Sequence, residues 1–302
     1  MERENDFFDL KDIFRAIWEE KIIFSTIVAF FAISSVFYAL SIPNVYQSKA
    51  ILAPSDSENQ DMLMSRYRGL SSLAGINLPV EEVSKSVEGI ERFRSFDFFK
   101  TLVDSSFQKQ DIIATKGWDP KTNNLYYDPN LYNSVSKEWV REVRFPKTQI
   151  PSDQEAFEIF QESFSIFLDD DSGFITLKLN HHSPYIAKNW LDEAISSLNE
   201  LMRNEDKKRA QKSLDYLNYQ ISDTNLTEIK QVLSLLIQKQ IETLTLIETN
   251  EEYVFKIIDS PIIPERKISP SRPVICILIT FVGLIIATIY SFYRYTRKLK
   301  KY

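Results

Sequence analysis

Two long apolar runs near the ends of the chain dominate its hydropathy pattern. Residues 22–42 and 274–293 contain no charged side chain, and twelve residues in each are Ile, Leu, Val or Phe. About 20 such residues are enough for a helix to cross the hydrocarbon core of a bilayer. The pattern therefore predicts transmembrane helices over residues 22–42 and 274–293.

The first run has an alternative reading as a secretory signal peptide. The apolar region of a signal peptide spans about 7–15 residues and is followed by a cleavage site of small residues. Here the run is longer, 21 residues precede it, and no Ala-x-Ala sequence follows. We therefore expect residues 22–42 to stay in the protein as a membrane anchor.

Basic residues flank the outer end of both runs. They are Arg3, Lys11, Arg15 and Lys21 before the first run and Arg294, Arg297, Lys298, Lys300 and Lys301 after the second. Lys and Arg beside a span favour the cytoplasmic side, whereas acidic residues contribute little. We expect cytoplasmic segments at residues 1–21 and 294–302 and one extracytoplasmic domain, residues 43–273.

Partly alternating apolar positions predict a strand next to each span. The first strand is predicted over residues 43–52, bounded by Pro43 and Pro54, and the second over residues 253–258, which end before Pro261. Because short segments join these strands to the spans, we expect them to pair in one sheet. That sheet would belong to a membrane-proximal α/β base.

A β-hairpin is predicted to add two strands to this base. Residues 164–168 and 174–179 flank the polar sequence Asp169-Asp170-Asp171-Ser172-Gly173. A calcium loop would place glycine sixth and a glutamate at its end, but here glycine is fifth and no suitable glutamate follows. The acidic sequence is therefore interpreted as a turn.

The rest of the base has weaker patterns. Residues 55–86 are rich in Ser, Asn, Asp and Glu and are expected to form a mobile loop with short helices. Residues 90–107 are expected to be helical. Residues 115–153 hold four prolines among Asn and Tyr, which predicts an irregular segment.

A long helical hairpin is predicted between the strands. Residues 185–260 contain neither Gly nor Pro, and Ser183 and Pro184 supply an N-cap and a first-turn proline. Cap-forming residues interrupt the pattern at residues 222–225, where Asn225 and Glu228 have the spacing of a capping box. We expect an arm over residues 183–250 and a base over residues 43–182 and 251–273.

The apolar seam of the first arm helix predicts contacts between copies of the chain. The seam is interrupted at residues 203–209, which are polar on all sides, and this indicates a helix that has left its core. We expect oligomer contacts at Leu198, Leu201, Leu214, Leu217 and Ile221. The alternative is a long helix packed entirely on its own domain.

Four prolines precede the second span within thirteen residues: Pro261, Pro264, Pro270 and Pro273. Proline fixes φ and restricts the residue before it, so a stiff extended tether between base and membrane is predicted. The alternative is that Pro261 and Pro273 merely end the strand and begin the helix.

The composition mainly excludes kinds of partner, covalent bond and functional site. The net charge of −6 disfavours nucleic acid as a partner, and the single cysteine, Cys276, excludes an intramolecular disulfide. The two histidines, His181 and His182, are adjacent at a strand end, which suits a surface better than a site. We therefore expect no catalytic residue, no cofactor, no metal and no enzymatic activity.

Several segments together resemble the polysaccharide chain-length determinant family, the Wzz-type co-polymerases. They are the strand at residues 46–52, Ser72-Leu73-Ala74-Gly75, residues 173–177 leading to 183–187, residues 198–203, residues 258–261, and the prolines before the second span. The resemblance implies a non-enzymatic, homo-oligomeric protein of the Gram-negative inner membrane with a periplasmic domain. Its implied partners are a membrane polymerase and the lipid-linked polysaccharide, such as O-antigen, whose length the oligomer sets.

Other functions fit the two-span layout less well. A generic scaffold for capsule or exopolysaccharide export, working with a separate kinase or outer-membrane channel, uses the same elements and stays open. A tyrosine autokinase needs a nucleotide-binding motif, and G-x-x-x-x-G-K-[ST] is absent from the chain. A membrane sensor needs a cytoplasmic output domain, for which the two short end segments are not expected to suffice.

Overall fold

The computed structural model describes residues 10–55 and 84–299. The chain divides into two compact units, Met1–Asn44 with Lys267–Tyr302, and Val45–Arg266. The predicted loop at residues 55–86 lies largely outside the described residues, as does Ser72-Leu73-Ala74-Gly75.

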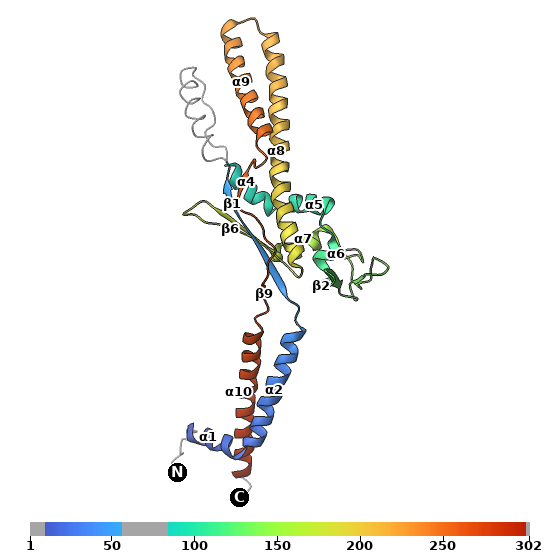
Figure 1. Cartoon of the computed structure of the whole chain (residues 1–302), viewed down its shortest axis with the longest axis vertical. Helices are drawn as coiled ribbons and strands as arrows, with labels where there is room; N and C mark the ends of the chain where they lie inside the picture. Colours follow the sequence, from blue (N-terminus) through green and yellow to red (C-terminus); the bar gives the residue numbers. More distant parts are fainter. Residues whose placement is uncertain (1–9, 56–83, 300–302) are drawn as a thin grey trace. The chain divides into compact units, whose positions relative to one another are not determined.

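The first unit holds both predicted apolar helices. These are α2 (Lys21–Ser41) and α10 (Arg272–Leu299), and both are long and apolar enough to cross a membrane. They lie side by side (Figure 1), with Gly283 so close to Phe31 that an added Cβ would be 2.5 Å from the Phe31 Cβ. A helix that the sequence analysis did not predict, α1 (Leu10–Glu19), runs across their ends, and the short strand β9 (Lys267–Ser269) precedes α10.

Polar contacts join α2 and α10 at both ends. The Arg272 guanidinium donates to the Ala39 carbonyl and to the Asn44 side chain, each at 3.2 Å. At the opposite end Glu20, which is 5% exposed, forms ion pairs with Arg294 and Lys298. These contacts set the register of the two helices.

The second unit is built on an antiparallel sheet. Its strands lie in the order β6 (Phe164–Leu168), β7 (Ile175–His181), β1 (Val45–Pro54) and β8 (Phe255–Asp259). The two strands predicted to pair do so, with Leu52 opposite Ile257. The predicted hairpin is β6–β7, and its turn places Gly173 at φ 71° while Asp169 accepts backbone N–H groups from Asp171 and Ser172 at 3.0 and 3.3 Å.

Helices cover one face of this sheet. The sheet contributes Ala50, Leu52, Leu177 and Leu179, whose spacing of two puts them on the same face. Above them lie the first turns of α8 (Pro184–Asp223), together with α4 (Lys85–Phe93), α5 (Phe96–Ser105) and α7 (Asp153–Ser163). These helices bring Leu191 and Ile195 and several phenylalanines into one core.

Residues 115–139 are more regular than predicted. After the short helix α6 (Lys109–Ile113) come two small hairpins, β2 (Thr115–Asp119) with β3 (Asn124–Tyr127) and β4 (Tyr132–Asn133) with β5 (Glu138–Trp139). Edge-to-face contact between Tyr132 and Trp139, with ring centroids 5.3 Å apart, links the second pair. Pairs this short depend on such cross-strand aromatic contacts, which composition does not reveal.

The predicted helical hairpin is present as α8 and α9 (Thr227–Thr249). Ser183 caps α8 as predicted, with its hydroxyl accepting the N–H of Ile186 and Pro184 in the first turn. The predicted capping box of Asn225 and Glu228 is wrong. The N-cap of α9 is Leu226, without a side-chain cap, so Glu228 occupies the second helical position and not the third that a capping box needs.

Candidate functional site

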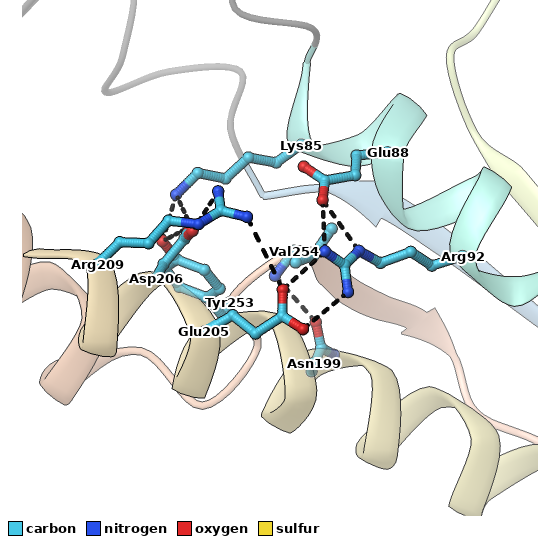
Figure 2. A network of polar contacts seen from close by, with 9 residues as sticks. All are labelled: Lys85, Glu88, Arg92, Asn199, Glu205, Asp206, Arg209, Tyr253 and Val254. Atoms are coloured by element: carbon cyan, nitrogen blue, oxygen red, sulfur yellow. Dashed lines mark hydrogen bonds and ion pairs between the residues drawn. The ribbon is translucent and has the colours of Figure 1, made fainter. Parts of the chain in front are cut away.

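The candidate site is the helical arm, the α8–α9 hairpin, and the polar junction at its base. We define the arm junction as the nine residues drawn in Figure 2: Lys85, Glu88, Arg92, Asn199, Glu205, Asp206, Arg209, Tyr253 and Val254. They come from α4, from the middle of α8 and from the segment that enters β8. None of residues 203–209 belongs to the hydrophobic core, as predicted, but the carboxylates of Glu205 and Asp206 contact other elements, which the sequence did not indicate.

Arg92 is the centre of one cluster in the junction. Its guanidinium donates to Glu88 at 2.7 and 2.9 Å and to Glu205 at 2.7 and 3.1 Å. The hydrogen bond with Glu205 is the main reason that the pKa of Arg92 is raised. Such charge-assisted bonds tie α4 directly to α8, across 113 residues of sequence.

Asp206 is the centre of the second cluster. It accepts a hydrogen bond from the Tyr253 hydroxyl at 2.7 Å and pairs with Lys85 at 2.9 Å. Burial alone would raise the pKa of Asp206, but the hydrogen bonds from Tyr253 and Lys85 outweigh it and lower the pKa. The carboxylate is therefore ionised and holds α8 against the segment before β8.

Asn199 is the buried polar residue of the arm junction. It is only 4% exposed, and its side-chain oxygen accepts the backbone N–H groups of Val254 and Phe255 at 2.9 and 3.0 Å. Its amide nitrogen donates to the Phe255 carbonyl at 3.0 Å. The sequence holds one signal for this buried role, since Asn199 is a polar residue beside Leu198 in an apolar seam. The backbone groups that it bonds begin 55 residues further along the chain, so the sequence does not identify them.

The five residues predicted to make oligomer contacts differ in how deeply the structure buries them. Leu198 is fully buried in the core of its own chain and Leu201 packs against that core. Leu217 is 8% exposed, on the α8 face that it shares with buried Ala210. The assignment of Leu198 and Leu217 to oligomer contacts is corrected, because intramolecular packing already buries them, whereas Leu201, Leu214 and Ile221 stay partly exposed.

The large apolar surface of the arm lies elsewhere, mainly on α9. Five side chains of α9 are between 36% and 50% exposed: Ile229, Val232, Leu235, Leu236 and Leu246. On α8, Tyr216 and Tyr219 are 62% and 66% exposed. We call these seven residues the arm face. Exposed apolar side chains in such numbers mark interaction surfaces, and tyrosine is enriched among the residues that dominate interfaces.

His181 is buried and does not lie on the surface as predicted. Its Nδ1 accepts the N–H of Ser183 at 2.9 Å and its Nε2 lies 3.2 Å from the Asp111 carbonyl, so Nε2 carries the proton. Burial lowers the pKa of His181 to about 4. The neutral ring packs on Trp190 and joins the end of β7 to the start of α8, which is a structural role.

No group of three or more His, Cys, Asp or Glu in residues 10–55 and 84–299 has a geometry that could hold a metal ion.

The predicted proline tether is divided between the units. Pro261 and Pro264 belong to Val45–Arg266, whereas Pro270 and Pro273 belong to the other unit, and α10 begins just before Pro273.

Comparison with known proteins finds a matching family model and similar solved structures, among them two polysaccharide co-polymerases. The family model for the Wzz chain length determinant protein matches residues 6–96. A full-length bacterial polysaccharide co-polymerase is 13% identical, with a TM-score of 0.44, over 97% of this chain and 99% of that chain. A fragment of WzzB, a polysaccharide co-polymerase from Salmonella Typhimurium, is 14% identical, with a TM-score of 0.31, over 75% of this chain and 100% of that chain. No curated protein sequence matches this chain.

The family match confirms the resemblance to the chain-length determinant family. It covers α2, β1 and α4, and so includes the first apolar helix and the strand on which the resemblance was first based. The α+β fold with apolar helices near both ends and a long helical hairpin is likewise confirmed.

Proposed function

We propose that this protein is a non-enzymatic regulator of polysaccharide chain length. It acts as a homo-oligomeric periplasmic scaffold beside a membrane polymerase that extends a lipid-linked polysaccharide, with both termini in the cytoplasm. The family match over residues 6–96 supports this function. The observation that supports a homo-oligomer is the arm face, because its side chains stay exposed although the base of the same chain buries a hydrophobic core.

The arm face supplies the attraction between copies. Fully burying a Leu, Ile or Val side chain contributes roughly 1.5–3 kcal/mol, so five half-exposed residues of α9 and two tyrosines are enough for association once neighbouring arms meet. The arm junction gives each arm the same direction relative to its own base. Identical arms on identical bases allow a repeated contact, and repetition around an axis closes a ring.

The decisive test is the length distribution of surface polysaccharide in cells with and without the gene. We expect a preferred length on a gel in the presence of the gene and a broad distribution of lengths in its absence. The double variant L235D/L236D should broaden the distribution in the same way, because two charges would have to be desolvated in the contact between arms. The control Ser234→Asp adds charge at an exposed position of the same helix that points away from the arm face, and it should leave the distribution unchanged.

Other outcomes of this experiment contradict the proposal. An unchanged distribution in the deletion strain would exclude length control. Complete loss of surface polysaccharide would favour the export scaffold, because a length regulator is dispensable for synthesis itself.

The proline tether is proposed to set how the periplasmic ring meets the polymerase. Replacing Pro264 and Pro270 together by Ala relaxes the fixed φ angles of the tether. We expect normal expression and oligomerisation with a shifted or broader length distribution. An unchanged distribution would mean that these prolines only end one element and begin another.

The proposed topology has its own test. A reporter that is active only outside the cytoplasm should be active when inserted at Asn225 and inactive when fused after Tyr302. Activity at the C-terminus would contradict it.

A further inference from the structure

A second apolar surface belongs to the short helix α1, at the end of the two apolar helices. Trp18 on this helix is 68% exposed, although tryptophan is highly buried on average in folded proteins. Five apolar positions of α1 have the spacing i, i+3, i+4, i+7 and i+8: Leu10, Ile13, Phe14, Ile17 and Trp18. This spacing gathers them on one side of a helix, and Lys11, Arg15 and Glu19 occupy another side. The sequence of α1 is therefore amphipathic.

The protein fixes the orientation of α1. The helix contacts both α10 and α2, and Ala16 is 0% exposed. Glu20, the residue between α1 and α2, pairs with Arg294 at 3.4 Å and with Lys298. Backbone hydrogen bonds continue through this corner, from the Glu20 N–H to the Ala16 carbonyl at 3.1 Å and from the Phe24 N–H to the Glu20 carbonyl at 2.9 Å. Because α1 is held across the ends of α2 and α10 (Figure 1), the direction of its apolar side is fixed as well.

Lys21 indicates the level of a bilayer at which α1 lies. It begins α2, and the residues that follow carry no charge through Ile42. A lysine at the end of a span keeps its ammonium group at the level of the lipid headgroups. The Lys21 Nζ lies 5.7 Å from the centroid of the Trp18 ring, so this ring lies at the same level. Tryptophan is enriched there, because its ring is apolar and its indole N–H is polar.

We propose that α1 is an interfacial helix, with its apolar side embedded in the boundary between headgroups and acyl chains of the leaflet that holds Lys21. The partner is phospholipid of the same bilayer that α2 and α10 cross, since the span itself brings α1 to that boundary. Helices that lie in this plane combine a polar side with an apolar side containing Trp, Phe or Leu. The inference rests on the proposed membrane spans, and the proposed topology makes this leaflet the cytoplasmic one.

The apolar side of α1, and not its charge, selects the lipid surface. The polar side carries charges of both signs: Lys11, Arg15, Asp12 and Glu19. Embedding therefore needs no anionic headgroup, and a lipid without net charge suffices as the partner. Since the ion pairs of Glu20 connect α1 to α10, an embedded α1 also sets the depth of both spans in the bilayer.

Spin labels on the full chain in phosphatidylcholine vesicles test this placement. In a Cys276→Ser background, I17C carries a nitroxide on the apolar side of α1, where Ile17 is partly exposed. The matched variant R15C carries one on the polar side, because two residues along a helix are about 160° apart around its axis. Oxygen concentrates in the bilayer, whereas a water-soluble nickel(II) chelate stays outside it. We expect the I17C label to collide more with oxygen and the R15C label to collide more with the nickel chelate.

Changing the anchor provides the second arm of the test. Trp18→Asp should shift the I17C label towards the nickel chelate, because an aspartate at this position opposes embedding. Glu19→Gln, on the polar side of the same helix, should leave the label where it is.

Two results would overturn the interfacial placement. An I17C label that collides mainly with the nickel chelate would show that the apolar side faces water. A label shielded from both reagents would show that protein, such as a second copy, covers this side. These measurements involve no polysaccharide, so their failure leaves the proposed function intact, and an unchanged length distribution in the deletion strain leaves the placement of α1 intact.

Discussion

The two halves of α8 are the most instructive comparison in the molecule. In the lower half, Leu191, Ile195 and Leu198 are fully buried and Asn199 has its polar groups bonded to backbone. In the upper half, only Ala210 and Leu217 are buried, while Tyr216 and Tyr219 face solvent. One continuous helix thus serves both as a core element and as an exposed support. The lower half is stabilised by its own chain, whereas the upper half leaves aromatic side chains exposed.

The largest expected effect distinguishes the core from the arm face directly. Leu191→Ala creates a cavity in a core position that is 0% exposed and should lower the free energy of unfolding by about 2–5 kcal/mol. Leu235→Ala, at a position that is 50% exposed, should change it by less than about 0.5 kcal/mol. Denaturant titration of the detergent-solubilised protein, diluted until it is monomeric and followed by circular dichroism, measures both. Equal losses would show that the arm face is already packed in the single chain.

The base should also carry a pH dependence through His181. The folded-state pKa of about 4 lies below the ordinary value of 6.5, so the unfolded chain binds more protons between these values. Stability should fall as the pH drops from about 6.5 to 4, by up to about 3 kcal/mol from this residue. Unfolding titrations at pH 7 and pH 4 should show a smaller pH dependence in His181→Gln than in the wild type.

Asn199 tests whether the junction depends on a single buried amide. Asn199→Ala leaves the N–H groups of Val254 and Phe255 without their acceptor, which should lower stability by about 2 kcal/mol. Hydrogen exchange should be faster at these two amides than in the wild type. Asn218→Ala, on the exposed upper half of α8, provides the comparison and should be within about 0.5 kcal/mol of the wild type. Similar losses in both would argue against a special role for the junction.

The smallest expected effect concerns the ion pairs. Glu205→Gln removes a charge that pairs with Arg92, and because the Glu205 side chain is 37% exposed, solvent screening should limit the loss to about 1 kcal/mol or less. Glu248→Gln, whose pair with Lys207 is more exposed, should cost less still. The difference between the two variants should shrink when unfolding is repeated at high salt. A loss for Glu205→Gln as large as that for Leu191→Ala would mean that the junction, and not the core, stabilises the base.

Sequence alone determined the elements whose signals are local. Long runs without charge predicted α2 and α10, because burial in lipid demands apolar side chains all round a helix. Ser183 and Pro184 predicted the start of α8, and Gly173 predicted the turn of the β6–β7 hairpin. In each case the residues that favour the conformation lie within a few positions of one another.

Tertiary structure alone decided which polar and apolar residues have partners. The acidic residues Glu205 and Asp206 look like a solvated stretch of helix until α4 and Tyr253 are placed beside them. His181 looks like a surface residue until Trp190 and the Asp111 carbonyl cover it, and the seam at Leu198 looks available for another copy until the sheet fills it. Periodicity shows that a helix has an apolar side, but the partner on that side is brought there by contacts across many tens of residues, and no local pattern contains that information.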